Sequence, residues 1–266
     1  MTGRCLGTVV FVEEAGEILE AHILANLGVS CKQLIMIGDH KQLRPKIDNY
    51  LLQKDSKNGF DANVSLFERL VVATGSKISV IPLTVQHRMR PEISRIIREM
   101  GLYDELKDHP RTFGRKSVTG VRKDVVFVNH LHPETQDEES ALVGTASKVN
   151  LFEVDMVVNI ANYIIQQGQY SLNQVTILTP YLGQLSLIQK KLEEFQIKSL
   201  ISDKDFGELA RHNLSNNSDK VAKHNRKIRV ATVDNFQGEE SYIVIISLVR
   251  SNPQFGKIGF LASEER

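Results

Sequence analysis

Cysteine is scarce in this chain of 266 residues, with Cys5 and Cys31 the only two. So few cysteines exclude a disulfide framework and a cysteine-based zinc site, and they favour a reducing compartment. Long apolar runs are also lacking, because runs such as Tyr242–Val249 have the length of a strand and cannot span a bilayer. We therefore expect a soluble intracellular protein, cytoplasmic or nuclear, with no membrane partner.

The chain has no excess of charge of either sign. Its formal net charge is +1, and its 41% hydrophobic and 24% charged residues are ordinary for a globular protein. This balance excludes a strongly basic tail but allows a local groove for nucleic acid. The length suffices for two compact domains, each with its own core.

Short apolar runs alternate with amphipathic stretches. Continuous apolar strands between helices predict an α/β fold with a mostly parallel sheet covered on both faces. Pro91 suits the first turn of a helix, and Asn150 with Glu153 resembles a capping box. The expected strands are Thr8–Val12, Gln33–Ile37, Val80–Val85, Asp124–Val128, Gln174–Leu178, Ile228–Val230 and Tyr242–Leu248. The expected helices are Glu17–Leu27, Val64–Val72, Pro91–Met100, Leu151–Gln167 and Leu182–Phe195.

Two polar stretches, near residues 103–124 and 199–227, interrupt this alternation. Both read as surface insertions, the first rich in Lys and Arg and the second poor in large apolar residues, as a mobile segment would be. A domain change is expected between Val72 and Val85. We place the first domain at residues 1–78 and the second at 79–266.

The most informative feature is a pair of carboxylates, Glu13 and Glu14, directly after the apolar run Thr8–Val12. A strand that delivers paired acids at its carboxyl end is how α/β nucleotide hydrolases hold Mg²⁺ and orient an attacking water. Such acids work with an upstream loop of the form G-x-x-x-x-G-K-[ST], which the residues before Glu13 do not contain. We therefore expect an ATP-driven motor that begins part-way through.

A second polar run, Gly38–Pro45, follows the expected strand Gln33–Ile37. Gly38 would allow a sharp turn at the carboxyl edge of the sheet, where ligands bind in open α/β folds. Gln42 could then hold the attacking water or a γ-phosphate oxygen. A plain polar turn is the alternative, which the length of the run makes weak.

A third group, Gln86-His87-Arg88, also ends an apolar strand. Arg88 presents a planar fork to phosphate and suits a transition-state clamp supplied from a neighbouring domain. His87 could stack on a base or fill the corner between strand and helix, and neither is preferred. Arg90 fits a solvated position at the start of the helix.

Two further groups follow later strands. One group, Gln237-Gly238-Glu239, would bring an amide and a carboxylate to a nucleotide cleft, and its glycine would allow the backbone to approach the nucleotide closely. The alternative is that these residues form only the polar tip of a β-turn-β connection. The hydroxyl of Thr179, two residues before Tyr181, could bind a backbone phosphate, although this segment alone more often forms a turn.

The order of these segments resembles the motif series of the superfamily 1 helicases of the up-frameshift/DNA2-NAM7 kind. Helicase-like proteins with NFX-type zinc fingers look most similar, because their acid motif also tends to begin with Glu. The resemblance covers nearly the whole chain, and several motifs in matched order are a specific signal. The matching segments are VEEAG, GDHKQLRP, VQHRMRPEI, LTPYLGQ, TVDNFQGEE and SLVRSN.

The resemblance implies two RecA-like domains that bind ATP between them and move 5′ to 3′ along single-stranded RNA or DNA. Glu13 would hold Mg²⁺ directly or through water, Glu14 would polarise the attacking water, Gln42 would sense the γ-phosphate, and Arg88 would be one of two arginine fingers. Other motif residues would contact the nucleic acid, namely Thr179, Tyr181 and Thr232. The nucleotide-binding set would be Gly38, Asp39, Gln86, His87, Gly238 and Glu239, with Glu239 near the ribose.

The sequence departs from this family pattern in three places. The first acid is usually Asp, so Glu13, one methylene longer, shifts the metal geometry. The Gly-Lys phosphate loop is absent, and so is the closing motif with the second arginine finger, expected after residues 259–261. We therefore expect the isolated chain to have little or no ATPase activity.

Two other functions stay open. One is a binding or regulatory module that keeps a nucleic-acid groove without turnover. The other is a Mg²⁺-dependent nuclease built on Glu13, Glu14 and Asp39, which only the acids favour. The sequence does not decide between RNA and DNA, because groove electrostatics serve both and 2′-OH contacts cannot be placed.

Overall fold

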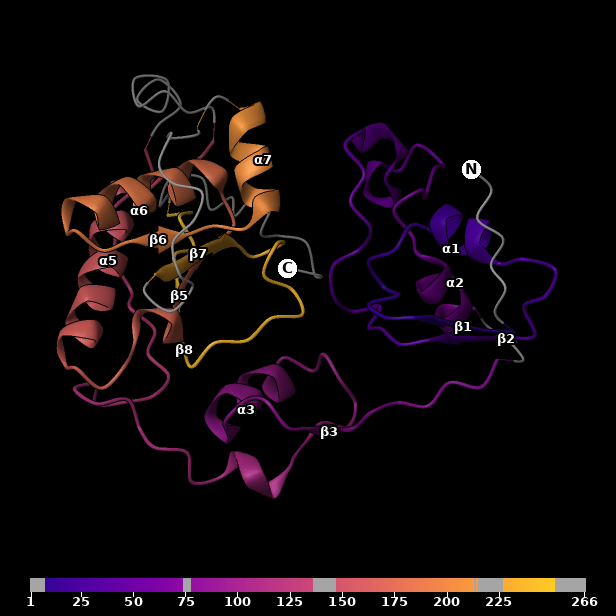
Figure 1. Ribbon diagram of the computed structural model, residues 1–266, viewed down its shortest axis with the longest axis horizontal. Helices are drawn as coiled ribbons and strands as arrows, with labels where there is room; N and C mark the ends of the chain where they lie inside the picture. Colours follow the sequence, from indigo (N-terminus) through magenta and orange to yellow (C-terminus); the bar gives the residue numbers. More distant parts are fainter. Residues whose placement is uncertain (1–7, 74–77, 136–146, 213, 215–226, 252–266) are drawn as a thin grey trace. The chain divides into compact units, whose positions relative to one another are not determined.

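The computed structural model describes residues 8–73, 78–135, 147–212, 214 and 227–251. Two compact units divide the described chain, the first ending at Thr84 and the second beginning at Val85. Parallel strands with helices beside them make up each unit (Figure 1), so the predicted α/β, RecA-like fold class is confirmed.

The first unit is built on two parallel strands, β1 (Val9–Val12) and β2 (Gln33–Met36). The helix α1 (Glu20–Asn26) connects them, as a parallel pair requires, and the helix α2 (Leu66–Val72) packs against it. The buried core is small, and Val9 and Phe11 on β1 are exposed. Its buried hydrophobic members are Val12, Ala15, Ile23 and Leu66. Two short 3-10 helices lie between β2 and α2, at Tyr50–Leu52 and Lys54–Ser56.

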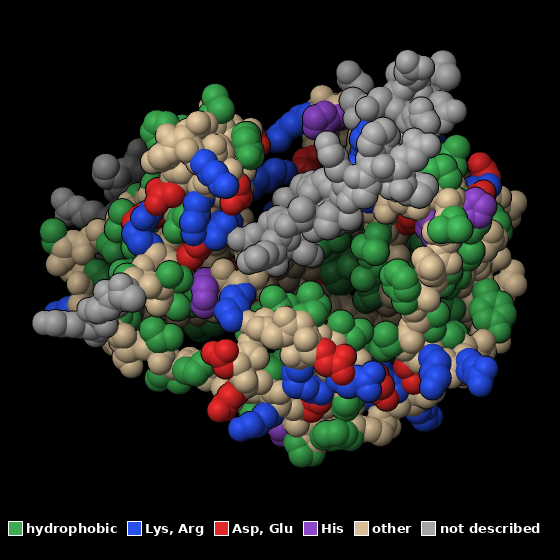
Figure 2. Space-filling model, turned by 180° about the vertical axis from the view of Figure 1, so that it is seen from behind, with side chains coloured by type: hydrophobic (Ala, Val, Ile, Leu, Met, Phe, Trp, Pro, Cys, Tyr) green, Lys and Arg blue, Asp and Glu red, His purple; other side chains and the backbone are tan. Residues whose placement is uncertain are grey.

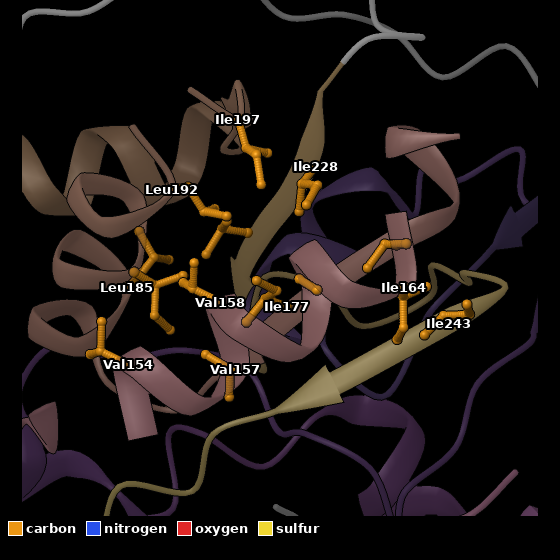
Figure 3. Packing of buried hydrophobic residues seen from close by; sticks show 14 of the residues in the cluster. Val154, Val157, Val158, Ile164, Ile177, Leu185, Leu192, Ile197, Ile228 and Ile243 are labelled. Carbon is orange, nitrogen blue, oxygen red and sulfur yellow. The ribbon is translucent and has the colours of Figure 1, made fainter. Parts of the chain in front are cut away.

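The second unit contains a four-stranded parallel sheet in the order β6-β7-β5-β8. All of β5 is buried, which fits the continuous apolar run read in the sequence. Figure 3 shows the side chains of α5, α6 and the strands meeting in one core, which includes Val158, Ile177 and Leu185. The strands are β5 (Val175–Thr179), β6 (Ser199–Leu200), β7 (Ile228–Thr232) and β8 (Ile243–Ile246). The helices are α5 (Leu151–Gln166), α6 (Leu182–Glu194) and α7 (Asp203–Arg211), with a 3-10 helix at Leu172–Gln174.

A smaller subregion opens the second unit. Strand β3 (Val85–Gln86) pairs in parallel with β4 (Lys107–Asp108), and α3 (Pro91–Glu99) lies between them in the chain. A 3-10 helix follows at Pro110–Thr112. Helix α3 starts at Pro91, as predicted from its missing N–H group.

Two predicted strands are wrong. Residues 80–84 are not in a strand, because Pro82 cannot donate to a ladder and strand pairing begins only at Val85. Asp124–Val128 forms no strand either. The Asp124 carboxylate there binds a neighbouring loop, and Phe127 is 79% exposed.

The sequence also predicted a sheet covered on both faces, but the edge strand β8 is exposed on one face. Val244 and Ile246 on this edge strand are exposed, while Ile243 is buried. Figure 2 shows hydrophobic side chains in green on the surface in several places. The apolar run Tyr242–Leu248 therefore contains a strand that is buried on one face and exposed on the other.

The stretch near 199–227 is not simply a surface insertion. Its first part forms β6, which pairs with β7, and α7, whose Leu209 is in the core. Ser202 caps α7 by accepting from the N–H of Asp205 at 3.0 Å. Residues 213 and 215–226 lie outside the described residues, as do Cys5 and the expected closing segment after 259–261.

The described helices are all too short or too polar to cross a membrane.

Candidate nucleotide and nucleic-acid site

The acid pair stands where β1 ends. The ladder with β2 continues past the strands, because the N–H of Ile37 donates to Val12 at 2.8 Å and the N–H of Ala15 donates to Ile37 at 2.9 Å. These bonds bury Ala15 and leave Glu13 and Glu14 exposed at the carboxyl edge of the sheet. Glu14 has a φ of +49°, a left-handed conformation that costs a non-glycine residue about 1–2 kcal/mol.

Two glycines bring the loops after β1 and β2 into contact. A Cβ added at Gly16 would lie 2.5 Å from the carbonyl oxygen of Asp39, and one at Gly38 would lie 2.8 Å from the N atom of Gly16. Neither distance is tolerable, so the close approach requires glycine at both positions. The sequence predicted Gly38 for a sharp turn, whereas its structural reason is this backbone contact.

Asp39 orders the loop that carries Gln42. Its carboxylate accepts from the N–H of Lys41 at 2.9 Å and from Nε2 of Gln42 at 2.8 Å. Such an Asp-centred turn fixes the backbone locally. The exposed Gln42 therefore lies on a loop that contacts the acid-bearing loop.

A buried ion pair that the sequence reading missed holds the end of this loop. Nε and Nη2 of Arg44 donate to the Glu68 carboxylate on α2 at 2.8 and 2.9 Å, and Lys54 adds a third bond at 3.2 Å. Burial acts to raise the pKa of Glu68, but the bonds and charges of Arg44 and Lys54 outweigh it and lower that pKa. The pattern Ser65-x-x-Glu68 was the available signal, since Ser65 caps α2.

In the second unit the side-chain amide of Gln86 is fully used by the protein. Its Oε1 accepts from the N–H groups of Arg88 and Met89 at 3.0 and 2.7 Å, and its Nε2 donates to the Met89 carbonyl and to Asp108, both at 2.7 Å. The amide therefore folds the turn after β3 and ties it to β4.

Arg88 and His87 both stand on the surface beside this turn. Nε of Arg88 donates to Glu240 at 2.8 Å, although both side chains are more than half exposed. His87 stacks on His109, with ring centroids 4.2 Å apart. Desolvation, followed by the charges of His109 and Arg111, lowers the pKa of His87. The ring thus stacks on a protein side chain, an arrangement that neither sequence alternative included.

Glu239 and Glu240, in the segment after β7, each bind an arginine. Nη2 of Arg229 donates to Glu239 at 2.7 Å and its guanidinium lies 5.6 Å from the ring centre of Phe236, while Glu240 binds Arg88. Gly238 has a φ of +78°, which favours glycine at this turn.

The candidate nucleic-acid residues lie at the carboxyl ends of β5 and β7, which pair in register at Thr179 and Thr232. Thr179 is fully buried, and its Oγ1 accepts from the N–H of Tyr181 at 3.5 Å. The Thr232 hydroxyl donates to the buried Asp205 on α7 at 2.6 Å. A phosphate contact by Thr232 therefore requires exchange of that bond.

A buried polar network, also missed by the sequence reading, joins α5, α6 and the segment after β8. Oε2 of Glu153 accepts from the Ser247 hydroxyl at 2.6 Å and from the N–H of Val249 at 2.9 Å. Gln184 donates to Ser247 at 2.9 Å and to the Asn150 carbonyl at 3.1 Å. The motifs LTPYLGQ and SLVRSN are thereby fixed to one helix.

The same network corrects the predicted capping box. Asn150 does cap α5, since its side chain accepts from the N–H of Glu153 at 3.2 Å. The reciprocal half is wrong, because the Asn150 N–H donates to Gln184 at 2.8 Å. The carboxylate of Glu153 instead accepts hydrogen bonds from the Ser247 hydroxyl and the Val249 N–H. Its Oε1 also lies 3.3 Å from Nε2 of His130.

The acid pair has the donor chemistry for Mg²⁺. Among the described residues, the Glu13 and Glu14 side chains form no hydrogen bond or ion pair. Mg²⁺ commonly takes one or two carboxylates and completes its octahedron with phosphate oxygens and waters. The residues fit an ion that arrives with a nucleotide, although the described ranges contain no group of three His, Cys, Asp or Glu able to hold a metal alone.

Comparisons with known proteins identify the family of the sequence. A family model described as "AAA domain" matches residues 62–266. NFX1-type zinc finger-containing protein 1 of Mus musculus is 39% identical over 97% of the chain. A helicase required for RNAi-mediated heterochromatin assembly in Schizosaccharomyces pombe is 37% identical, and a regulator of nonsense transcripts 1 homolog in Neurospora crassa is 32% identical, each over 97% of the chain.

The chain spans only a part of these relatives, 11% of the mouse protein, 22% of the S. pombe protein and 21% of the N. crassa protein. The matched family model nevertheless covers most of the chain. On that match and the ordered motifs, the chain belongs to the AAA-domain family, among the superfamily 1 helicases of the up-frameshift/DNA2-NAM7 kind.

Proposed function

We propose that this chain is part of an ATP-dependent helicase or translocase that moves 5′ to 3′ on single strands, with RNA as its substrate. The observation that carries the proposal is the meeting of the loops after β1 and β2, which places the exposed Glu13 and Glu14 beside the loop of Gln42 at one sheet edge. Family membership supplies the nucleic-acid context. RNA is preferred because of the similarity to NFX1-type proteins.

The first unit prepares the hydrolytic water. Glu13 holds Mg²⁺, directly or through water, and Glu14 accepts hydrogen bonding from the attacking water. Gln42 contacts the γ-phosphate or that water once its bond to Asp39 is exchanged. Bound ATP with Mg²⁺ supplies the phosphoanhydride bond that breaks and the metal charge that balances the phosphates.

The second unit contributes charge and recognition. Arg88 stabilises the charge on the phosphates in the assembled motor, which requires it to leave Glu240. The other proposed nucleotide-binding groups are Gly38, Asp39, Gln86, His87, Gly238 and Glu239. Thr179, Tyr181 and Thr232 form the proposed contact with the nucleic-acid backbone, with Thr232 shaped by Asp205.

The test is nucleic-acid-stimulated ATP hydrolysis by the full-length protein that carries this sequence. We expect single-stranded RNA to stimulate turnover and Glu14→Gln to abolish that stimulation while RNA binding persists. If Glu14→Gln retained turnover, a residue other than Glu14 would have to polarise the attacking water. Asp48→Asn, which removes another exposed carboxylate of the first unit, is the matched control.

We also propose that the 266 residues alone hydrolyse ATP slowly or not at all, because no G-x-x-x-x-G-K-[ST] run occurs among them. A steady-state assay of the isolated chain measures this. Turnover equal to that of the full-length protein would overturn it.

The alternative is a binding module without turnover. It predicts RNA binding by the full-length protein with no stimulated hydrolysis. A nuclease gains no support, because Glu13, Glu14 and Asp39 do not form a three-ligand metal cluster in the described residues. The intracellular location stays a prediction.

A further inference from the structure

Five basic side chains between residues 111 and 123 form no ion pair with an acid in the part of the chain that the structure describes. Several other basic side chains of this unit do pair with an acid: Arg95 pairs with Glu99, Arg98 with Asp108 and Lys191 with Asp155. Among the described residues no carboxylate forms an ion pair with any member of the group, and every member is exposed. We name this group the basic loop surface, and it consists of Arg111, Arg115, Lys116, Arg122 and Lys123.

Asp124 draws the second half of this surface together. Its carboxylate accepts from the Ser117 hydroxyl at 2.9 Å and from the N–H of Val118 at 2.8 Å. Lys116 directly precedes Ser117 and Lys123 directly precedes Asp124, so these bonds bring the two lysines close together along the folded chain. Nη2 of Arg90 lies 2.8 Å from the Asp124 carboxylate and compensates its negative charge. Asp124 therefore does not compensate the positive charges of Lys116 and Lys123.

The loop between them is anchored to a rigid helix. The Tyr163 hydroxyl on α5 donates to the Gly120 carbonyl at 3.0 Å. A Cβ at Gly120 would lie 2.8 Å from that hydroxyl, and the φ of +81° also favours glycine. The basic side chains are thus presented by an ordered backbone, which reduces the entropy lost on binding.

The first half of the surface converges on one carbonyl oxygen. Nε of Arg111 and Nη2 of Arg115 both donate to the His87 carbonyl, at 3.3 and 3.4 Å. A neutral carbonyl leaves both guanidinium charges uncompensated, and each has further N–H groups to offer. The lowered pKa of His87 fits this field, since the charge of Arg111 contributes to it after desolvation and His109.

We propose that the basic loop surface binds the sugar-phosphate backbone of the single strand on which the motor acts. The proposal rests on the proposed function and adds a contact region apart from the ends of β5 and β7. Guanidinium and ammonium groups recognise phosphate without reading sequence, and Arg111 and Arg115 offer planar donor pairs suited to phosphate oxygens. An acidic protein segment is the competing ligand.

The test measures how salt weakens binding of single-stranded oligouridylate to the full-length protein, by fluorescence anisotropy without nucleotide. The variant is Lys116→Gln with Lys123→Gln, which removes two side chains that hold no described contact and so spares the fold. Loss of two phosphate contacts should reduce the slope of log K against log salt by about 1.4 and weaken binding about tenfold at moderate salt.

The matched control is Lys190→Gln with Lys204→Gln, which changes net charge equally at exposed positions on α6 and α7. We expect its slope to equal that of the wild type. An unchanged slope in the Lys116 and Lys123 variant, with wild-type binding intact, overturns the basic loop surface alone. Absence of RNA binding by the wild type overturns the proposed function as well, and capture of polyglutamate by this surface without RNA would assign it to a protein partner.

Discussion

The acids after β1 in the first unit differ from the polar residues at several strand ends of the second unit. In the first unit, the exposed carboxylates of Glu13 and Glu14 form no hydrogen bond or ion pair with another described residue. In the second, Thr232 binds Asp205, Glu239 binds Arg229, and Ser247 binds Glu153. Unpartnered carboxylates at a sheet edge are suited to an external ligand, whereas side chains bonded to other parts of the protein hold loops in place. We therefore expect loss of Glu14 to affect hydrolysis, and loss of the bonds in the second unit to affect the stability of its loops.

Replacement of Glu14 is the strongest test of this contrast, because ATP hydrolysis is expected to need its carboxylate. Replacing it with Gln keeps the shape of an exposed side chain but removes the base, so stimulated ATP turnover should fall about 10²–10⁴-fold with little change in stability. Turnover of the full-length variant and its thermal melting measure the two effects. A large fall in melting temperature with modest loss of turnover would give Glu14 the structural role reserved here for the second unit.

Glu153 should behave in the opposite way. Glu153→Leu removes the acceptor of Ser247 and of the Val249 N–H, and leaving both donors buried should cost about 2–4 kcal/mol of unfolding free energy. Urea denaturation followed by a probe in the second unit measures the loss.

Asp155→Asn provides the control on the same helix, because the Asp155 side chain is exposed and pairs with Lys191. Loss of such a surface pair should cost less than about 1 kcal/mol. Equal losses for the two variants would show that the Glu153 network does not stabilise the unit.

The contact between the loops after β1 and β2 gives a third test. Gly38→Ala places a Cβ 2.8 Å from the Gly16 N atom, so the backbones must separate and stability should fall by about 1–3 kcal/mol. Stimulated ATPase should fall with it, because Gln42 and the acid pair would separate.

Gly207→Ala is the matched control. Nothing lies within 4 Å of a Cβ at this position on α7. A helical Gly-to-Ala change without strain should stabilise the protein by about 0.5–1 kcal/mol. Destabilisation by both alanines would remove the argument from close backbone approach.

Sequence reasoning placed the strand ends well because apolar runs flanked by polar residues mark them directly. Strands β1, β2, β5, β7 and β8 all fall within one or a few residues of the expected ranges. Val80–Val85 and Asp124–Val128 failed because an apolar run carries no information about whether a partner strand lies beside it. Helix α7 was missed because its apolar contribution is concentrated in residues such as Leu209 within a charged stretch.

The candidate site divides in the same way. Motif order identified Glu13, Glu14, Gln42 and Arg88, whose roles stay predictions. The sequence could not predict the hydrogen bonds within the protein. Gln86 binds Asp108 and Glu153 binds Ser247 only because the fold brings these distant residues together. Hydrogen bonds over such sequence separations leave no local pattern to read.

The smallest expected effect concerns Glu68, a carboxylate of the first unit that is bonded to Arg44 and Lys54. Its pKa is lowered in the folded state, so its stabilising contribution is complete above its ordinary value near 4.5 and is lost as pH falls through the lowered one. Glu68→Gln should therefore make the acid limb of first-unit stability shallower, in melting curves recorded from neutral to acidic pH. Asp48→Asn should leave that limb unchanged, because the Asp48 side chain is exposed. An acid limb that Glu68→Gln does not alter would mean that Arg44 and Lys54 do not favour the charged carboxylate, and Glu68 would then no longer differ from the unbonded Glu13 and Glu14.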